Sequence, residues 1–141
     1  MVYKVVYFSR GGTSKRVAEK IANRLSCESI EIMDNMNWKG FIGFIKGGYY
    51  ASKNKAVEIT YSKKLESFDA LIVVSPLWAG GVVPAIKMFL KSVPNEEINL
   101  VMTSLGSLIV DRSGYASVWD VVKSKKNEDD IIKALVNNLK V

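Results

Sequence analysis

Continuous apolar runs along the chain predict the strands of a buried sheet. Val2 to Phe8 is apolar, β-branched and aromatic, and Phe68 to Ser75 contains the uninterrupted run Ala-Leu-Ile-Val-Val. Runs of this kind, without alternating polar residues, are typical of parallel strands that are covered on both faces. Residues 98–103 form a further buried run, and residues 29–33 and 115–122 predict two more strands, the first of which is short and close to an edge.

Apolar residues at helical spacing follow several of these strands. One such stripe begins after Ser14, and a second begins at Pro84, which suits a first helical turn because it has no N–H to satisfy there. A third stripe follows the acidic residues 128–130, whose charge favours a helix N-terminus. Residues 35–54 carry aromatic and aliphatic side chains three or four apart, but glycines weaken any helix there. We expect an irregular helix packed on the sheet at 35–54, with docking to a membrane surface or a partner as the alternative.

The alternation of strands and helices predicts the fold class. Strands separated by helices form a parallel sheet that carries helices on both faces. We therefore expect one domain over residues 1–141, with a three-layer, doubly wound α/β fold and a five-stranded parallel sheet. Only about ten residues separate the fourth and fifth strands, which is close to the minimum for a parallel crossover, so the fourth helix must be short or absent.

Composition narrows the chemistry that the chain can perform by itself. The single Cys27 excludes an internal disulfide, and the absence of histidine removes the commonest general base and a common metal ligand. Any reaction is therefore expected to depend on a bound cofactor. The apolar runs are much shorter than the roughly 18 residues needed to span a bilayer, and the N-terminus has no cleavage-site pattern, so we expect a cytoplasmic protein without a membrane span. The net charge is +6, but the basic residues are scattered without interleaved aromatic residues, which predicts a solvated surface and no nucleic-acid partner.

Three loops are expected at the carboxyl ends of the strands, where ligands bind in open α/β sheets. The first, Ser9 to Ser14, contains glycines and hydroxyl residues and leads into a helix. Its N–H groups and hydroxyls can surround a phosphate at the positive end of that helix, although the same residues also suit an ordinary strand-to-helix turn. The second, Pro76 to Gly81, places Trp78 beside two glycines, where either a planar ring system packs on the indole or the indole folds back over the sheet edge. The third is Ser104 to Ser107.

Two of these loops resemble those of the flavodoxin-like family. Residues 5–18, V-V-Y-F-S-R-G-G-T-S-K-R-V-A, resemble the phosphate loop whose usual form is T/S-x-T-G-x-T after the first strand. Residues 68–90, F-D-A-L-I-V-V-S-P-L-W-A-G-G-V-V-P-A-I-K-M-F-L, are similar to the segment that runs from the third strand through the flavin-stacking loop. Residues 38–50 also resemble the W-K-G-F…G-G-Y stretch of compact flavodoxin-like proteins. The resemblance implies the strand order 2-1-3-4-5 and FMN as the cofactor.

The resemblance also implies a role for each matching residue. By this reasoning Ser9, Arg10, Gly11, Gly12, Thr13 and Ser14 hold the FMN phosphate, Pro76, Leu77, Trp78, Ala79 and Gly80 border one edge and face of the isoalloxazine, and Ser104, Leu105 and Gly106 border the other. Gly11 departs from the family pattern, because a threonine hydroxyl usually contacts the phosphate there. The third loop has no aromatic residue, which leaves the opposite ring face open. In the family the second loop rearranges on one-electron reduction, a change that Gly80 or Gly81 could make here.

Three functions are compatible with the sequence. An electron carrier would exchange electrons with a redox partner protein, whereas a small FMN-dependent reductase or oxidase would act on a quinone-like or other aromatic substrate. The third is a flavodoxin-fold interaction module that has lost its cofactor, because Gly11 removes one phosphate contact. We expect the electron carrier. The sequence identifies neither the redox partner nor the oligomeric state.

Overall fold

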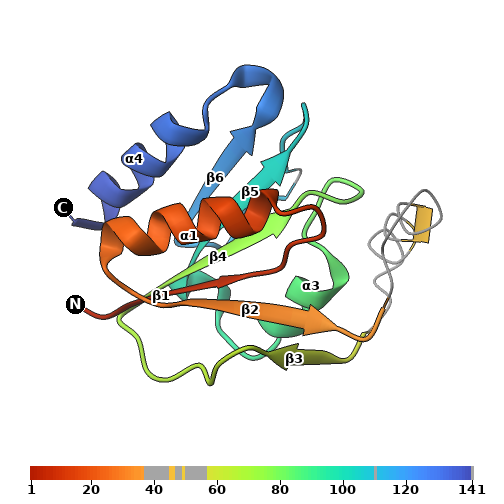
Figure 1. The fold of residues 1–141 in the computed structure, drawn as a ribbon, viewed down its shortest axis with the longest axis horizontal. Helices are drawn as coiled ribbons and strands as arrows, with labels where there is room; N and C mark the ends of the chain where they lie inside the picture. Colours follow the sequence, from red (N-terminus) through yellow and green to blue (C-terminus); the bar gives the residue numbers. More distant parts are fainter. Residues whose placement is uncertain (37–44, 47–48, 50–56, 110, 141) are drawn as a thin grey trace.

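The computed structural model describes residues 1–36, 45–46, 49, 57–109 and 111–140. Figure 1 shows the arrangement of the helices and strands. In chain order they are β1 (Tyr3–Tyr7), α1 (Thr13–Leu25), β2 (Ser29–Asp34), β3 (Ile59–Tyr61), β4 (Ala70–Pro76), α3 (Pro84–Leu90), β5 (Ile98–Ser104), β6 (Ser117–Val122) and α4 (Glu128–Lys140), with the 3₁₀ turns η1 (Asn95–Glu97) and η2 (Lys123–Lys125).

The strands form one sheet in the order β3-β2-β1-β4-β5-β6. β1 lies between β2 and β4 and is parallel to both, with Val5 opposite Ser29 on one side and Ile72 on the other. β5 and β6 extend the sheet in parallel beyond β4, and β3 pairs antiparallel with β2. The carboxyl ends of the five parallel strands therefore point to the same side of the molecule (Figure 1).

The sheet differs from the prediction at the β2 edge. The predicted five-stranded, wholly parallel sheet is wrong in strand count and order, because β3 adds a sixth, antiparallel strand beside β2. Three residues are too few to show the alternation that identifies a strand, and β3 takes this conformation through its pairing with β2. Counted without β3, the parallel strands lie in the predicted succession. Residues 105–109 and 111–116, between β5 and β6, contain no helix, as the short connection predicted.

The irregular helix predicted for residues 35–54 falls largely on residues outside the described part of the chain. The described residues include no helix with the length and apolar character that crossing a membrane requires.

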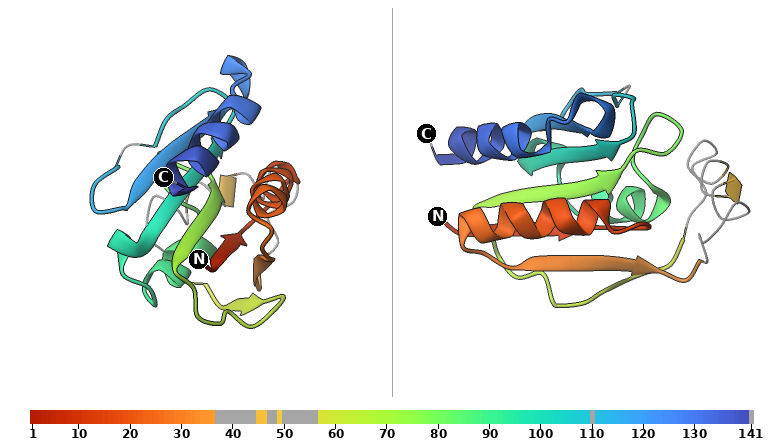
Figure 2. Two further views of the ribbon diagram at one scale, coloured as in Figure 1. Left: turned by 90° about the vertical axis from the view of Figure 1, so that its left-hand side faces the viewer. Right: turned by 45° about the horizontal axis from the view of Figure 1, so that its top comes forward.

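The core lies in two layers, one on each face of the sheet. Alternate residues of a strand point to opposite faces. In β1, Val5 packs in the layer that contains α1 and α4, whereas Val6 packs in the layer that contains α3. In β4, Ile72 and Val73 divide in the same way. The helices thus cover both faces and leave the carboxyl ends of the strands accessible (Figures 1 and 2).

Candidate functional site

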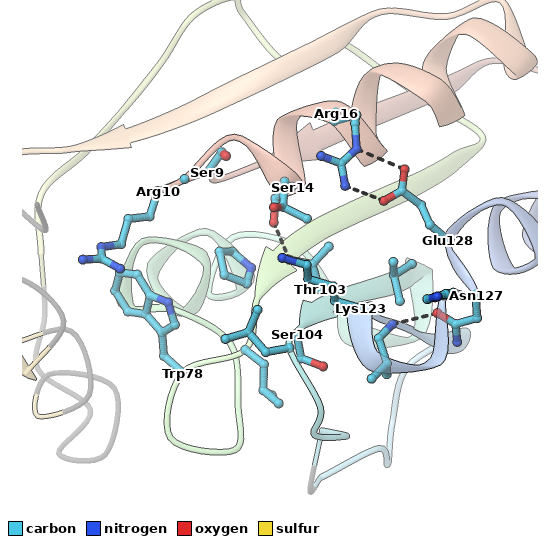
Figure 3. Close-up of a pocket in the computed structure, with 18 residues that line it drawn as sticks. Ser9, Arg10, Ser14, Arg16, Trp78, Thr103, Ser104, Lys123, Asn127 and Glu128 are labelled. Atoms are coloured by element: carbon cyan, nitrogen blue, oxygen red, sulfur yellow. Dashed lines mark hydrogen bonds and ion pairs between the residues drawn. The ribbon is translucent and has the colours of Figure 1, made fainter. Parts of the chain in front are cut away.

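A cavity of about 550 Å³ lies at the carboxyl ends of β1, β4, β5 and β6. Its volume is in the range typical of small-molecule and cofactor sites. Figure 3 shows Arg10 and Trp78 at one end of it, Ser14 and Thr103 near its centre, and Lys123, Asn127 and Glu128 toward the other end. The position agrees with the rule that ligands of open α/β sheets bind beyond the carboxyl ends of the strands.

All three loops identified in the sequence reach this cavity. The predicted site residues that line it are Ser9, Arg10, Gly11, Thr13, Ser14, Pro76, Leu77, Trp78, Ser104 and Leu105. Gly12 is not part of the lining and instead precedes the first residue of α1. Ala79 and Gly80 form the tip of the second loop, and Gly80 lines a separate cavity of about 310 Å³. Gly106 also lies outside the lining, close to Ser124.

The sequence reasoning missed a second group of lining residues. They are Arg16, Thr103, Val121, Val122, Lys123, Lys126, Asn127 and Glu128. Thr103 was within reach of a sequence argument, because it is the last residue of the predicted strand before the third loop. The residues of β6 and the start of α4 reach the cavity only through the tertiary packing of α4 beside α1, for which the sequence has no local signal.

The loop after β1 is closed by a hydrogen bond within itself. The Gly12 N–H donates to Ser9 Oγ at 2.9 Å, and Gly12 has a backbone φ of +94°. A side chain with a Cβ rarely adopts this conformation, so the sharp entry into α1 requires glycine at this position. Gly11 has no positive φ, and a Cβ added there would meet no atom within 4 Å.

Alanine substitutions at the two glycines should have different effects on stability. Gly12→Ala is expected to lower the free energy of unfolding by about 1–2 kcal/mol, because alanine would be forced into a left-handed conformation. Gly11→Ala should be neutral or slightly stabilising, since it restricts the unfolded chain without strain in the folded one. Urea unfolding of both variants checks this, and equal destabilisation would contradict the described backbone of the loop.

The N-terminus of α1 is suited to an anion. It has no side-chain cap and no acidic residue in its first turn, and the first N–H groups of a helix have no intrahelical partners. The helix dipole adds partial positive charge at the same point. Ser14 Oγ is buried and lies 2.8 Å from Thr103 Oγ1, which joins α1 to the end of β5. Ser9 and Thr13 lie in the same lining.

Trp78 has two sets of contacts. Its ring lines the cavity, and it also lies edge-to-face with Phe8, with ring centroids 5.9 Å apart and planes at 87°. It is half-buried and packs against the core layer that contains α3. The indole therefore both folds back onto the sheet edge and presents surface to the cavity, so the two possibilities raised by the sequence are compatible.

The second loop turns tightly between Trp78 and Gly81. The N–H of each of these residues donates to the carbonyl of the other, at 2.9 and 3.1 Å. Ala79 and Gly80 have φ values of +52° and +79°, which is the pattern of a type I′ turn. Flipping the central peptide would give a type II′ turn, which requires glycine at the position that Ala79 occupies. Gly80 can accommodate such a flip, whereas Ala79 opposes it.

The third loop and the residues that follow it are attached to β6 and to the turn after β6. The Ile109 N–H donates to Asp120 Oδ1 at 3.2 Å, and Arg112 forms an ion pair with the same carboxylate. The Ser124 N–H donates to the Leu105 carbonyl at 2.9 Å. Leu105 itself is 76% exposed at the edge of the cavity. This loop is therefore held in place while its apolar tip remains in solvent.

An ion cluster joins α1 to α4 beside the cavity. Arg16 donates to both oxygens of Glu128, at 2.6 and 3.1 Å, and Lys20 Nζ lies 2.7 Å from the same carboxylate and 3.0 Å from Asp129. The hydrogen bonds from Arg16 lower the pKa of Glu128 from its ordinary value of 4.5 to about 2, with Lys20 adding to the effect. Glu128 is therefore ionised throughout the physiological range.

The lowered pKa of Glu128 predicts a loss of stability in acid. The contribution is complete above pH 4.5, the unfolded value, and disappears as the pH falls toward 2, because the folded state must then give up a paired carboxylate. We expect this loss to be about 1–2 kcal/mol after allowance for solvent screening. Unfolding of the wild type and Glu128→Gln between pH 2 and 6 measures it. Asp130→Asn, which alters a carboxylate in the same helical turn, is the control, and a wild-type profile that matches Glu128→Gln would contradict the ion pair.

Comparison with known proteins establishes the fold. No protein-family model matches the chain, and no curated protein sequence does. A flavoprotein from Lactobacillus acidophilus NCFM, crystallised in complex with FMN, is 19% identical, with a TM-score of 0.65 over 92% of this chain and 97% of that one. Crystal structures described as candidate flavoproteins from Bacteroides eggerthii DSM 20697 and Bacteroides uniformis ATCC 8492 have TM-scores of 0.75 and 0.72 at 20% and 18% identity. They cover 99% and 95% of this chain and 98% and 97% of their own lengths.

These similarities span nearly the whole chain at low sequence identity. They confirm the predicted flavodoxin-like fold, which this chain shares with structures of flavoproteins. The site residues remain predictions, because shared folds host different functions.

Proposed function

We propose that the chain binds FMN in the cavity at the carboxyl ends of its strands and carries electrons with it. The observation that carries the proposal is that three separate loops line one cavity, with an uncapped helix N-terminus near its centre and an indole at its end. The FMN complex of the Lactobacillus acidophilus flavoprotein, which has the same fold, supports the choice of cofactor.

The phosphate of FMN fits the loop from Ser9 to Ser14. Ser9, Thr13 and Ser14 lie in the lining, and the α1 N-terminus has no carboxylate in its first turn to repel an anion. Arg10 also lines the cavity, at the end where Trp78 lies (Figure 3). The loop and the helix N-terminus therefore supply hydrogen-bond donors and partial positive charge to the phosphate.

The flavin ring fits between the second and third loops. Pro76, Leu77 and Trp78 offer an apolar border on one side, and Leu105 offers one on the other. The edge-to-face contact with Phe8 fixes the orientation of the indole before a ligand arrives, which reduces the entropy lost on binding.

The lining supplies little acid-base chemistry of its own. FMN, when bound, supplies one- and two-electron transfer. Among the described residues that line the cavity, Glu128 is the one carboxylate, and Arg16 and Lys20 hold its pKa at about 2. A general acid or base needs a pKa near the working pH, so Glu128 is unsuited to proton transfer. This favours a carrier that exchanges electrons with a redox partner protein.

A small FMN-dependent reductase or oxidase is the second candidate. The observation that favours it is the third loop, where Ser104 and Leu105 line the cavity without an aromatic side chain. A flat, quinone-like or aromatic substrate could therefore reach the opposite face of the ring.

An absorbance spectrum of the purified protein tests the proposal first. We expect the absorbance bands of oxidised flavin in the protein as purified. If the protein is purified without flavin, we expect added FMN to change its spectrum on binding, at one FMN per chain. Steady-state assays with NADH or NADPH and a soluble quinone then separate carrier from enzyme, and we expect no sustained turnover without a partner protein. Sustained turnover would favour the second candidate, and a protein that neither contains nor takes up FMN would contradict both.

A further inference from the structure

The cavity continues beyond the loop that the FMN phosphate would occupy. Ser14 and Thr103, joined by a 2.8 Å hydrogen bond, lie near its centre, with Trp78 to one side and Lys123 to the other (Figure 3). We call the part beyond them the basic compartment, which is lined by Arg16, Val121, Val122, Lys123, Lys126 and Asn127. None of its residues belongs to the three loops assigned to FMN.

The charges of the basic compartment favour an anion. Lys123 and Lys126 are exposed at its rim, and neither ammonium group forms an ion pair with another described residue. Glu128 is the carboxylate at this end, and Arg16 and Lys20 both pair with it. Lys20 is shared with Asp129, which together with Asp130 lies outside the lining. Within the lining, Arg16, Lys123 and Lys126 therefore face one carboxylate, which favours an anionic ligand.

The walls of the compartment are fixed before any ligand binds. The Asn127 side chain accepts from the Val122 N–H at 2.8 Å and donates to the Asp120 carbonyl at 3.1 Å, so it ties the start of α4 to the end of β6. Val121 and Val122, the last two residues of β6, also line the compartment, and Val121 packs in the core layer that contains α1 and α4. A fixed wall with a cationic rim suits a ligand that carries an anionic group.

The backbone at Lys126 points to the same conclusion. Lys126 has a φ of +51°, a conformation that glycine or asparagine adopts at lower cost. Lys126 ends the 3₁₀ turn η2, and residues in this conformation are enriched at functional sites. Glycine at this position would satisfy the turn equally well and would lack the ammonium group.

We propose that the basic compartment binds a second phosphate-bearing group, next to the phosphate of the bound flavin. This proposal rests on the proposed function, in which the phosphate of FMN binds at Ser9 to Ser14. Two sources share this chemistry, namely a separate adenine nucleotide such as ADP, and the adenosine monophosphate portion by which a dinucleotide flavin differs from FMN. Because the proposed cofactor is FMN, we expect the separate nucleotide.

Titration of the FMN-saturated chain with ADP at low ionic strength tests this inference. We expect saturable binding of one ADP per chain, weakened at least fivefold in the double variant Lys123→Ala/Lys126→Ala. Lys125→Ala/Lys133→Ala removes the same charge from exposed positions outside the lining and should leave the affinity for ADP unchanged. Lys126→Gly should also weaken ADP binding while the midpoint of thermal unfolding stays the same or rises, which separates a loss of contact from a loss of fold.

Titration of the apoprotein with FAD and FMN separates the two sources. If FAD binds more tightly than FMN, and the double variant loses the difference, the second phosphate belongs to a dinucleotide flavin. If ADP does not bind and FAD binds no more tightly than FMN, the basic compartment is not a phosphate site. The same conclusion follows if both double variants lose equal affinity for ADP. If FMN fails to bind but ADP still binds with the same dependence on Lys123 and Lys126, the proposed function fails and the compartment stands.

Discussion

Replacing Trp78 with alanine is expected to weaken FMN binding by roughly 5- to 150-fold. Stacking of a planar ring on an aromatic side chain contributes about 1–3 kcal/mol, which corresponds to this range in Kd. Trp78 lines the cavity, and Phe8 packs against its ring, so the indole is already oriented when the flavin arrives. The measurement is the Kd for FMN, from quenching of flavin fluorescence or from calorimetry.

Two further substitutions serve as controls for Trp78→Ala. Trp78→Phe keeps an aromatic face and should lose much less affinity than Trp78→Ala. Trp119→Phe alters an indole that packs in the opposite core layer and does not line the cavity, so it should leave the Kd unchanged. Circular dichroism confirms that each variant is folded. A Trp78→Ala variant that is folded and retains wild-type affinity would contradict the stacking role.

Introducing threonine at position 11 is expected to tighten FMN binding by roughly 10- to 150-fold. A hydrogen bond to a charged group contributes about 1.5–3 kcal/mol, and the family pattern has a threonine hydroxyl at the position that Gly11 occupies. The space allows it, because a Cβ at Gly11 meets no atom within 4 Å and the backbone has no positive φ there. Calorimetric titration of apo Gly11→Thr with FMN measures the gain.

Gly11→Val is the matched control for this gain of affinity. Valine has nearly the shape and stiffness of threonine but lacks the hydroxyl, so it should give none of the improvement. Equal affinities for the threonine and valine variants would mean that position 11 does not face the phosphate.

The parallel part of the fold could be predicted from local sequence, because its strands carry their own signal. β4 is a continuous run of apolar residues, and Pro84 follows the glycines of its loop at the start of α3. β3 could not be predicted in the same way, because Ile59, Thr60 and Tyr61 form a strand through pairing with β2. A three-residue strand contains almost no periodicity of its own.

The residues of the candidate site also fall into those with a local sequence signal and those without one. The loops after β1 and β4 were predictable because glycine and tryptophan are unusual directly after a buried strand, and of these residues Gly11 and Trp78 line the cavity. Arg16 and Glu128 lie 112 positions apart in the chain and meet because α1 and α4 pack side by side on the sheet. Neither residue carries a motif, and both look like ordinary charges on the solvent face of a helix. Contacts of this kind follow from tertiary packing and leave no trace in local spacing.

Calorimetric titration of the apoprotein with FMN and with riboflavin is the most direct measurement of the central claim, because the two ligands differ only in the phosphate. The loop from Ser9 to Ser14 and the uncapped N-terminus of α1 are proposed to hold that phosphate through several hydrogen bonds, each of which contributes about 1.5–3 kcal/mol when the partner is charged. We therefore expect FMN to bind at least about tenfold more tightly than riboflavin, at one molecule per chain. Equal affinity for the two ligands would contradict the phosphate assignment and the function built on it.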